Sequence, residues 1–417
     1  MPTFARTVPT GKAITGLAVA AALVAPAGTP ALARSSGEAA TLTRSSGEAA
    51  PLTLPAPTGR YPVGTVPLHL VDRSRPDPWV AARPYRELMV SVWYPARRSP
   101  NLPTAPHMSP RAAEDFGKTL AAALFGVKPG EVDWAVTETH AGAGAPVSRS
   151  AGRLPVVLFS PGFGAPRSVG TTVIEDLASR GYVVVSVDHT HEAAQVEFPG
   201  GRLERSTFPP QPTQDAMNKA LEVRVADTRF VLDQLTRLDG GHNPDAGRRP
   251  LPAGLRGGLD LSRVGMLGHS MGGATAAQVV HDDRRVDAGV NLDGGHRGAV
   301  ARTGLAKPFL QVAAEQHTRV GDPTWWSFWD RSKGWKRELR FTGARHYSFT
   351  DAEALAPQLT GLPENALREL IGTIGPDQAV AAQRAYVAAF FDLHLKGRDT
   401  PLFDGPAGRY PAVELIP

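Results

Sequence analysis

A serine between two glycines is the residue with the clearest chemical signature in this chain. In Gly268-His269-Ser270-Met271-Gly272, Ser270 follows a strand-like run that starts at Arg263 and precedes a helix-like run. A G-x-S-x-G sequence between a strand and a helix predicts a tight turn that presents the serine hydroxyl as a nucleophile. Glycine is needed at 268 and 272 because larger side chains would clash across the turn. We expect His269, which cannot rotate onto its neighbour Ser270, to pack beneath the turn.

A serine hydroxyl becomes a good nucleophile only when a histidine accepts its proton and a carboxylate orients that histidine. Where a strand leads into such a serine turn, the chain order is serine, acid, histidine. Four histidines follow a plausible acid: His296, His317, His346 and His394. We predict His346 as the base because it lies in a loop just beyond the last predicted strand, whereas His394 falls inside the predicted helix 379–396.

Two carboxylates end predicted strands at positions suited to orient His346. Asp293 ends one strand and is followed by two glycines, which suit a sharp turn, while Glu315 ends the next strand in a polar run. The local sequence pattern favours Asp293 as the carboxylate that orients His346, and Glu315 remains the alternative.

Acyl transfer by a serine also needs backbone N–H groups that stabilise the oxyanion of the intermediate. One donor is expected to be the amide of Met271, directly after the nucleophile. The second is expected in the loop Ser160-Pro-Gly162-Phe163-Gly164, where we predict the amide of Phe163.

The elements around these residues predict an α/β protein with the α/β-hydrolase fold. Continuous apolar runs indicate strands buried on both faces, and helical patterns separate them. Crossover helices between such strands imply a mostly parallel, doubly wound sheet of about eight strands with helices on both faces. The predicted strands are 85–94, 154–160, 182–188, 263–268, 287–293, 308–314 and 337–341, and the predicted helices are 222–238, 271–280 and 379–396.

The N-terminus predicts export. Residues 1–33 combine Arg6 and Lys12 with an apolar stretch and small residues ending at Ala33, which is typical of a cleaved signal peptide. Residues 34–58 carry a tandem decapeptide repeat and are predicted to be a flexible leader, since two short polar copies cannot form a stacked repeat. Residues 59–417 are predicted to be one catalytic domain. We therefore expect a secreted, extracellular protein.

The composition is that of a globular protein with a large core: 42% of the 417 residues are hydrophobic and 20% are charged. The chain has no cysteine, which excludes thiol catalysis and cysteine metal sites. The net charge of +5 falls to +3 without the signal peptide, which holds two basic and no acidic residues. So small an excess predicts a solvated basic surface and no nucleic-acid partner.

With these residues in view, the chain from Tyr61 to Pro417 resembles the secreted and intracellular type II branch of the platelet-activating-factor acetylhydrolases. The likeness covers the oxyanion segment, the run 176–189, the Gly-His-Ser-Met-Gly-Gly elbow, the Leu-Asp-Gly turn and the His-Tyr-Ser-Phe loop. In that family the acid lies shortly after the elbow, on the neighbouring strand, which implies Asp293. The resemblance implies esters of short or oxidised acyl groups on phospholipids, or small soluble esters, as substrates. It implies neither metal nor organic cofactor.

Actinobacterial cutinases, which attack polyesters, are the main alternative because they share the elbow. They place the acid in a Gly-Ala-Glu-x-Asp-Thr type segment, where this chain has His317, and they rely on a disulfide. An acyltransferase would use the same three residues but transfer the acyl group to an alcohol. A non-catalytic binding module would have lost a catalytic residue or an elbow glycine.

Two further clusters are open to interpretation. Trp325, Trp326 and Trp329 lie between the acid and the base in sequence, and they could bind acyl chains or make transient contact with a lipid interface, or they could pack on the core. Arg224 and Asp227 are spaced to pair on one helical face, and we expect a surface or structural role for them.

Overall fold

The computed structural model describes residues 51–405 and 408–417. The predicted signal peptide and most of the predicted leader lie outside these residues and stay predictions. Residues 51–58, the end of the predicted leader, lie against the domain, and the side chains of Leu52 and Leu54 are buried there. The packed part of the chain therefore begins before residue 59.

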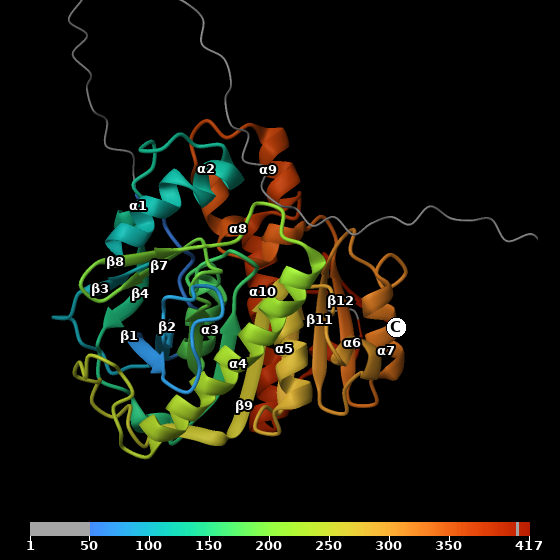
Figure 1. Ribbon diagram of the computed structural model, residues 1–417. Coiled ribbons are helices and arrows are strands. Elements are labelled where there is room, and N and C mark those ends of the chain that lie inside the picture. The colour runs from blue at the N-terminus through green and yellow to red at the C-terminus, as the bar shows by residue number, and fades with distance from the viewer. Residues whose placement is uncertain (1–50, 406–407) are drawn as a thin grey trace, which may run out of the picture.

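One mixed sheet runs through the molecule (Figure 1). In the described part of the chain it has eleven strands in the order β13-β12-β11-β10-β9-β5-β6-β2-β1-β4-β3. The strands are β1 (Val63–Asp72), β2 (Arg86–Pro95), β3 (Thr104–Pro106), β4 (Glu138–Ala143), β5 (Leu154–Ser160), β6 (Val183–Asp188), β9 (Leu259–His269), β10 (Ala288–Leu292), β11 (Phe309–Ala314), β12 (Lys336–Phe341) and β13 (Val413–Ile416). A separate hairpin consists of β7 (Gln195–Phe198) and β8 (Arg202–Arg205).

The central strands confirm the predicted doubly wound α/β sheet. The six strands from β12 to β6 are parallel, and β2 joins them antiparallel. All seven predicted strands are present. The expected count of about eight was too low because β1, β3, β4 and β13 extend the two edges, where strands are short or partly exposed and lack a continuous apolar run.

Helices cover both faces of the sheet (Figure 1). On one face lie α4 (Gln214–Asp239) and α5 (Met271–Asp282), and on the other lie α3 (Thr171–Ser179) and α10 (Pro376–Lys396). The long helix α4 begins where the Thr213 side chain accepts a hydrogen bond from the amide of Ala216, a standard N-cap.

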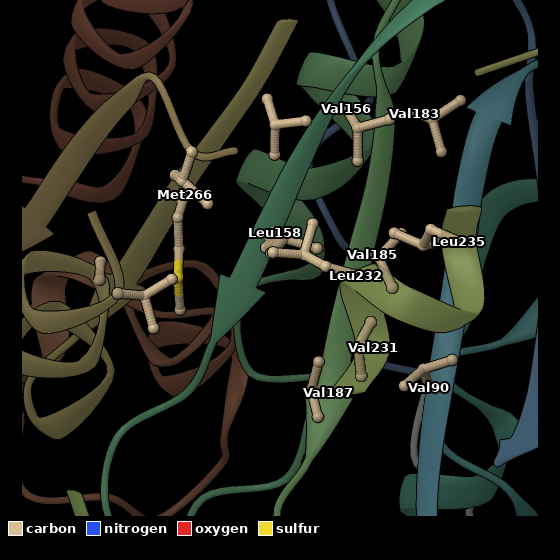
Figure 2. Close-up of a cluster of buried hydrophobic side chains, with 14 of the residues drawn as sticks. Val90, Val156, Leu158, Val183, Val185, Val187, Val231, Leu232, Leu235 and Met266 are labelled. Atoms are coloured by element: carbon tan, nitrogen blue, oxygen red, sulfur yellow. The ribbon is translucent and has the colours of Figure 1, made fainter. Parts of the chain in front are cut away.

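The core on the α4 face shows how the sheet and helix fit (Figure 2). Alternate residues of the strands point to this face, since successive side chains of a strand lie on opposite sides. Each such valine or leucine contributes roughly 1.5–3 kcal/mol when fully buried. Strand residues Val90, Val156, Leu158, Val183, Val185, Val187 and Met266 pack against Val231, Leu232 and Leu235 of α4.

A smaller third cluster lies beside the sheet and is formed by short elements (Figure 1). They are α1 (Pro110–Lys118), α2 (Leu120–Phe125), η1 (Trp134–Val136), α8 (Ala352–Leu355), η4 (Ala356–Gln358) and α9 (Glu364–Ile371). The remaining short elements are η2 (Arg149–Ala151), α6 (Val300–Thr303), α7 (Pro323–Arg331), η3 (His346–Phe349) and η5 (Pro401–Phe403). Among the described helices, none is long and apolar enough to cross a membrane.

The register of the parallel strands brings Ser270 and Asp293 together at the carboxyl ends of the central strands. Leu292 of β10 pairs with His269 of β9 and with Val312 of β11, so these strands end side by side. The residues that follow them are Ser270 and Asp293, at the carboxyl ends where ligands bind in sheets of this kind.

Candidate active site

Ser270 occupies a strained turn between β9 and α5. Its backbone has φ 57° and ψ −121°, a conformation that non-glycine residues rarely adopt. The Ser270 amide donates to the carbonyl oxygen of Leu292 at 2.8 Å, which ties the turn to β10. The side chain is partly exposed, so the hydroxyl is accessible on a rigid support.

Two glycines are required by close approaches around this turn. A Cβ on Gly272 would lie 1.9 Å from the carbonyl oxygen of Ser160, and a Cβ on Gly294 would lie 2.0 Å from the carbonyl oxygen of Ser270. Neither gap admits a carbon atom. The elbow therefore packs directly on the end of β5 and on the turn after β10.

Asp293 and His346 are brought together although 53 residues separate them. Asp293 follows β10 with φ 59°, and its Oδ2 accepts a hydrogen bond from Nδ1 of His346 at 2.6 Å. The Asp293 side chain is 5% exposed and that of His346, in η3, is 37% exposed. The carboxylate is thus shielded while the imidazole reaches the surface of the site.

The other oxygen of Asp293 binds a second histidine, His317, whose place in the sequence indicated only a candidate base. Oδ1 accepts from the Ala314 amide at 2.8 Å and pairs with Nδ1 of His317 at 3.0 Å. Nε2 of His317 pairs with Asp322 at 2.9 Å. Burial alone would raise the pKa of Asp293, but hydrogen bonds from His317 and His346 hold that pKa below its usual value. No local sequence signal distinguishes this role for His317.

The side chain of Glu315, the alternative acid, does not contact His346, although the Glu315 amide donates to the carbonyl oxygen of Ala344 at 3.2 Å. This side chain is exposed, and among the described residues the Glu315 carboxylate has no hydrogen-bond or ion-pair partner. Of the two carboxylates left open by local pattern, only Asp293 contacts the histidine. Among the other histidines that follow an acid, His296 is buried against Gln311, and His394 packs against Trp335 as part of α10.

His269 packs beneath the turn, as its position predicted. Nε2 of His269 bonds to the carbonyl oxygen of His346 at 2.9 Å, and the two imidazole rings are 4.5 Å apart. Burial, together with the neighbouring His346, lowers the pKa of His269 to about 3, so this ring is neutral. Through its hydrogen bond to the His346 carbonyl, His269 supports the loop that carries the predicted base.

The two predicted oxyanion donors are free to bind a ligand. Phe163 follows Gly162, whose Cα lies close to Ser270: a Cβ built there would be 3.4 Å from the Cβ of Ser270. Met271 is the first residue of α5, where an amide has no partner within the helix. In the described part of the chain, neither the Phe163 amide nor the Met271 amide donates to another group.

The three tryptophans have different surroundings. Trp325 is fully buried, and its Nε1 donates to the carbonyl oxygen of Gly294 at 2.7 Å, so it supports the turn after Asp293. The cationic groups of Arg319 and Lys336 both lie over the ring of Trp329, at 4.2 Å and 4.8 Å from its centroid. Trp326 is 58% exposed. Of the three, only Trp326 offers most of its ring to a ligand.

An aromatic group that sequence reasoning missed lies beside the predicted oxyanion loop. The ring of Phe163 meets that of Phe208 edge-on at 5.0 Å, and Phe208 meets Trp79 at 4.7 Å. All three side chains are partly exposed. They come from three separate connections, so no sequence spacing relates them. Within residues 51–405 and 408–417, no group of three or more His, Asp or Glu side chains is arranged to hold a metal ion.

Comparison with known proteins shows which family this chain is similar to. Residues 49–401 match the family described as platelet-activating factor acetylhydrolase, isoform II. A probable 1-alkyl-2-acetylglycerophosphocholine esterase of Arthroderma benhamiae is 32% identical, over 87% of this chain and 93% of that protein. The platelet-activating factor acetylhydrolase of Cavia porcellus is 22% identical, over 58% of each chain.

A solved structure confirms the fold. The ferulic acid esterase from Streptomyces cinnamoneus superimposes with a TM-score of 0.74 at 39% identity, covering 88% of this chain and all of that one. The α/β-hydrolase fold and the carboxylic ester hydrolase activity expected from the sequence are thereby confirmed. This chain belongs to the isoform II family of platelet-activating factor acetylhydrolases.

Proposed function

We propose that this esterase works through Ser270 as nucleophile, His346 as general base and acid, and Asp293 as the carboxylate that orients His346. The observation that carries the proposal is the 2.6 Å hydrogen bond between Asp293 and Nδ1 of His346, at the sheet edge where Ser270 is presented. With Nδ1 donating to the carboxylate, Nε2 is left unprotonated and able to accept the serine proton.

The reaction runs in two half-reactions. Oγ of Ser270 attacks the ester carbonyl carbon while its proton passes to Nε2 of His346. The tetrahedral intermediate then collapses, the C–O bond to the alcohol breaks, and His346 returns the proton to the departing alcohol. Water attacks the acyl-serine in the same way, giving up a proton to His346, and the carboxylic acid leaves as Oγ regains that proton.

We assign the oxyanion of both tetrahedral intermediates to the amides of Phe163 and Met271. Two donors fixed before the reaction lower its barrier because they need no reorganisation as charge develops. The absence of any other acceptor for these two amides among the described residues supports the assignment.

For substrates we propose short-acyl phospholipids of the platelet-activating-factor type, or small soluble esters. Family membership and the similarity to a probable 1-alkyl-2-acetylglycerophosphocholine esterase support this class. A second candidate, esters of hydroxycinnamic acids, is favoured by the rings of Phe163, Phe208 and Trp79 beside the oxyanion loop and by the 39% identical ferulic acid esterase. Aromatic faces of this kind stack on planar acyl groups.

We propose transient contact with a lipid interface through the segment after β11. Val320 is 92% exposed and Trp326 is 58% exposed. Binding of the protein to phosphatidylcholine vesicles should weaken in Trp326→Ser while hydrolysis of a soluble ester is unchanged. Equal vesicle binding by both proteins would argue against this contact.

We propose export as well, and N-terminal sequencing of protein from the culture medium should show cleavage after Ala33.

The test of the proposed mechanism is hydrolysis of p-nitrophenyl esters from acetate to palmitate, a short-acyl phospholipid, methyl ferulate and a polyester film. Ser270→Ala and His346→Gln should each lower kcat by about 10⁶. Ser262→Ala, a change on the same strand outside the site, should leave kcat unchanged. An active Ser270→Ala enzyme would refute the assignment, and preferred transfer to an added alcohol would identify an acyltransferase. Preference for the film would favour the cutinase alternative.

A further inference from the structure

A buried arginine lies behind the loop that carries the Phe163 amide. Arg224 of α4 is 1% exposed, and its guanidinium donates to two successive backbone carbonyls. Nη1 reaches the oxygen of Pro161 at 2.6 Å, and Nη2 reaches the oxygen of Gly162 at 3.0 Å. The pairing with Asp227 expected from helical spacing is wrong: each of the two residues binds groups on other elements.

The guanidinium is itself held by further contacts. Nε of Arg224 donates to Oε2 of Glu192 at 2.8 Å, Nη2 donates to Oε1, and the Glu192 side chain is 1% exposed. Nη1 also donates to Oγ of Ser160 at 3.1 Å. Ser160 in turn contacts His189, which is paired with Asp227. A buried arginine with all its edges engaged has one orientation, because leaving any donor unpaired would cost free energy.

The peptide group between Gly162 and Phe163 links this arginine to the oxyanion site. The carbonyl of Gly162 and the N–H of Phe163 belong to the same peptide, and the described chain has no cis peptide bond. In a trans peptide these two groups point in opposite directions. Arg224 and the amide of Ala165, at 3.1 Å, both bind the Gly162 oxygen. Fixing the carbonyl toward α4 therefore fixes the Phe163 N–H away from it.

This peptide lies next to the nucleophile. A Cβ on Gly162 would be 3.1 Å from Nδ1 of His269 and 3.4 Å from Cβ of Ser270. Rotation of the 162–163 peptide would move the Phe163 N–H off the reacting carbonyl. A guanidinium fork that holds two successive carbonyls opposes that rotation.

We propose that Arg224 is a positioning residue for ester hydrolysis: by binding the carbonyls of Pro161 and Gly162 it aims the Phe163 amide at the oxyanion. The inference rests on the proposed function, because it takes the Phe163 amide to be an oxyanion donor. Glu192, whose side chain is as buried as that of Arg224, neutralises and orients the guanidinium.

The test compares three variants. The double variant Arg224→Met, Glu192→Gln removes the donors without leaving a buried carboxylate unpaired. Arg224→Lys keeps the charge but loses the fork. Arg384→Met is the matched control, because Arg384 is also a buried arginine that donates to three backbone carbonyls, but those of Pro55, Ala56 and Thr172, away from the loop.

Each protein is assayed with p-nitrophenyl acetate and with trifluoroacetone, which forms an oxyanion adduct with the serine. The concentration of active sites is titrated with a fluorophosphonate, so that kcat is calculated per folded, reactive enzyme. The double variant should lose about 10- to 100-fold in kcat, while its KM stays within about threefold of the wild-type value. This loss is smaller than the roughly 10²- to 10³-fold fall in kcat caused by removing an oxyanion donor outright, because the Phe163 amide is still present. The inhibition constant for trifluoroacetone should rise by a similar factor. Arg224→Lys should lie between the double variant and wild type.

Arg384→Met should lower thermal stability while kcat per active site and trifluoroacetone binding stay at wild-type values. If the double variant behaves like Arg384→Met, Arg224 is structural only and the inference fails. If kcat and KM change while trifluoroacetone binding does not, the residue does not act on the oxyanion and the inference also fails. Failure of the proposed function is distinct: wild-type protein would then neither hydrolyse the ester nor react with the fluorophosphonate.

Discussion

The pairing of His317 with two carboxylates should make part of the stability of this protein depend on pH. The His317 side chain is 20% exposed and lies between Asp293 and Asp322, with 3.0 Å and 2.9 Å contacts at its two nitrogens. Burial alone would lower the pKa of His317, but the two carboxylates raise it to about 9. The folded protein therefore binds this proton more tightly than the unfolded chain does.

The sign and size follow from proton linkage. A pKa raised above the ordinary value of 6.5 stabilises the folded state fully below pH 6.5, and that stabilisation is lost as pH rises through about 9. At 1.36 kcal/mol per pKa unit, the shift corresponds to at most about 3 kcal/mol, of which about 2 kcal/mol remains at pH 7.5.

The assay is urea unfolding of wild type and His317→Gln at several pH values between 7.5 and 10. The difference in free energy of unfolding between them should shrink by about 2 kcal/mol over this range. His394→Gln is the control: burial lowers the pKa of His394 to about 4, so this ring is neutral throughout the range and the difference from wild type should stay constant. A pH-independent difference for His317→Gln would refute a charged His317 between the two carboxylates.

Three further outcomes are expected. Asp293→Asn should lower kcat for p-nitrophenyl acetate by about 10⁴, whereas Glu315→Gln, an exposed position, should leave it unchanged; the reverse would overturn the choice of acid. Gly272→Ala, which puts a carbon 1.9 Å from the Ser160 oxygen, should abolish fluorophosphonate labelling or soluble expression, and normal labelling would contradict this packing. Burial raises the pKa of Glu353 to about 7, so the stability that its bound proton contributes is complete below about pH 4.5 and is lost as pH rises to 7. Glu353→Gln should therefore gain about 2 to 3 kcal/mol relative to wild type between pH 5 and pH 8 in urea unfolding, and no relative gain would exclude this ionisation.

Expectations from sequence succeeded where the physical constraint is local or periodic. The elbow was recognisable because a close approach between neighbouring segments requires glycine at 272, whatever the rest of the chain does. The central strands were recognisable because burial on both faces demands continuous apolar residues. The outer strands β1, β3, β4 and β13, of which β3 and β13 form the two edges, were missed because short or partly exposed strands lack a continuous apolar run.

Composition and short motifs on this chain thus determined the α/β class, the position of the serine turn and the candidates for base and acid. Tertiary structure decided which groups meet. Strand register places Asp293 beside His346 and leaves Glu315 exposed. The packing of helices α4 and α7 turns Arg224 toward the loop of Gly162 and places Trp325 under the acid turn. These contacts join residues 31 to 62 positions apart, and their geometry depends on how strands align and helices pack. That alignment results from the whole core, so no local run of residues encodes it.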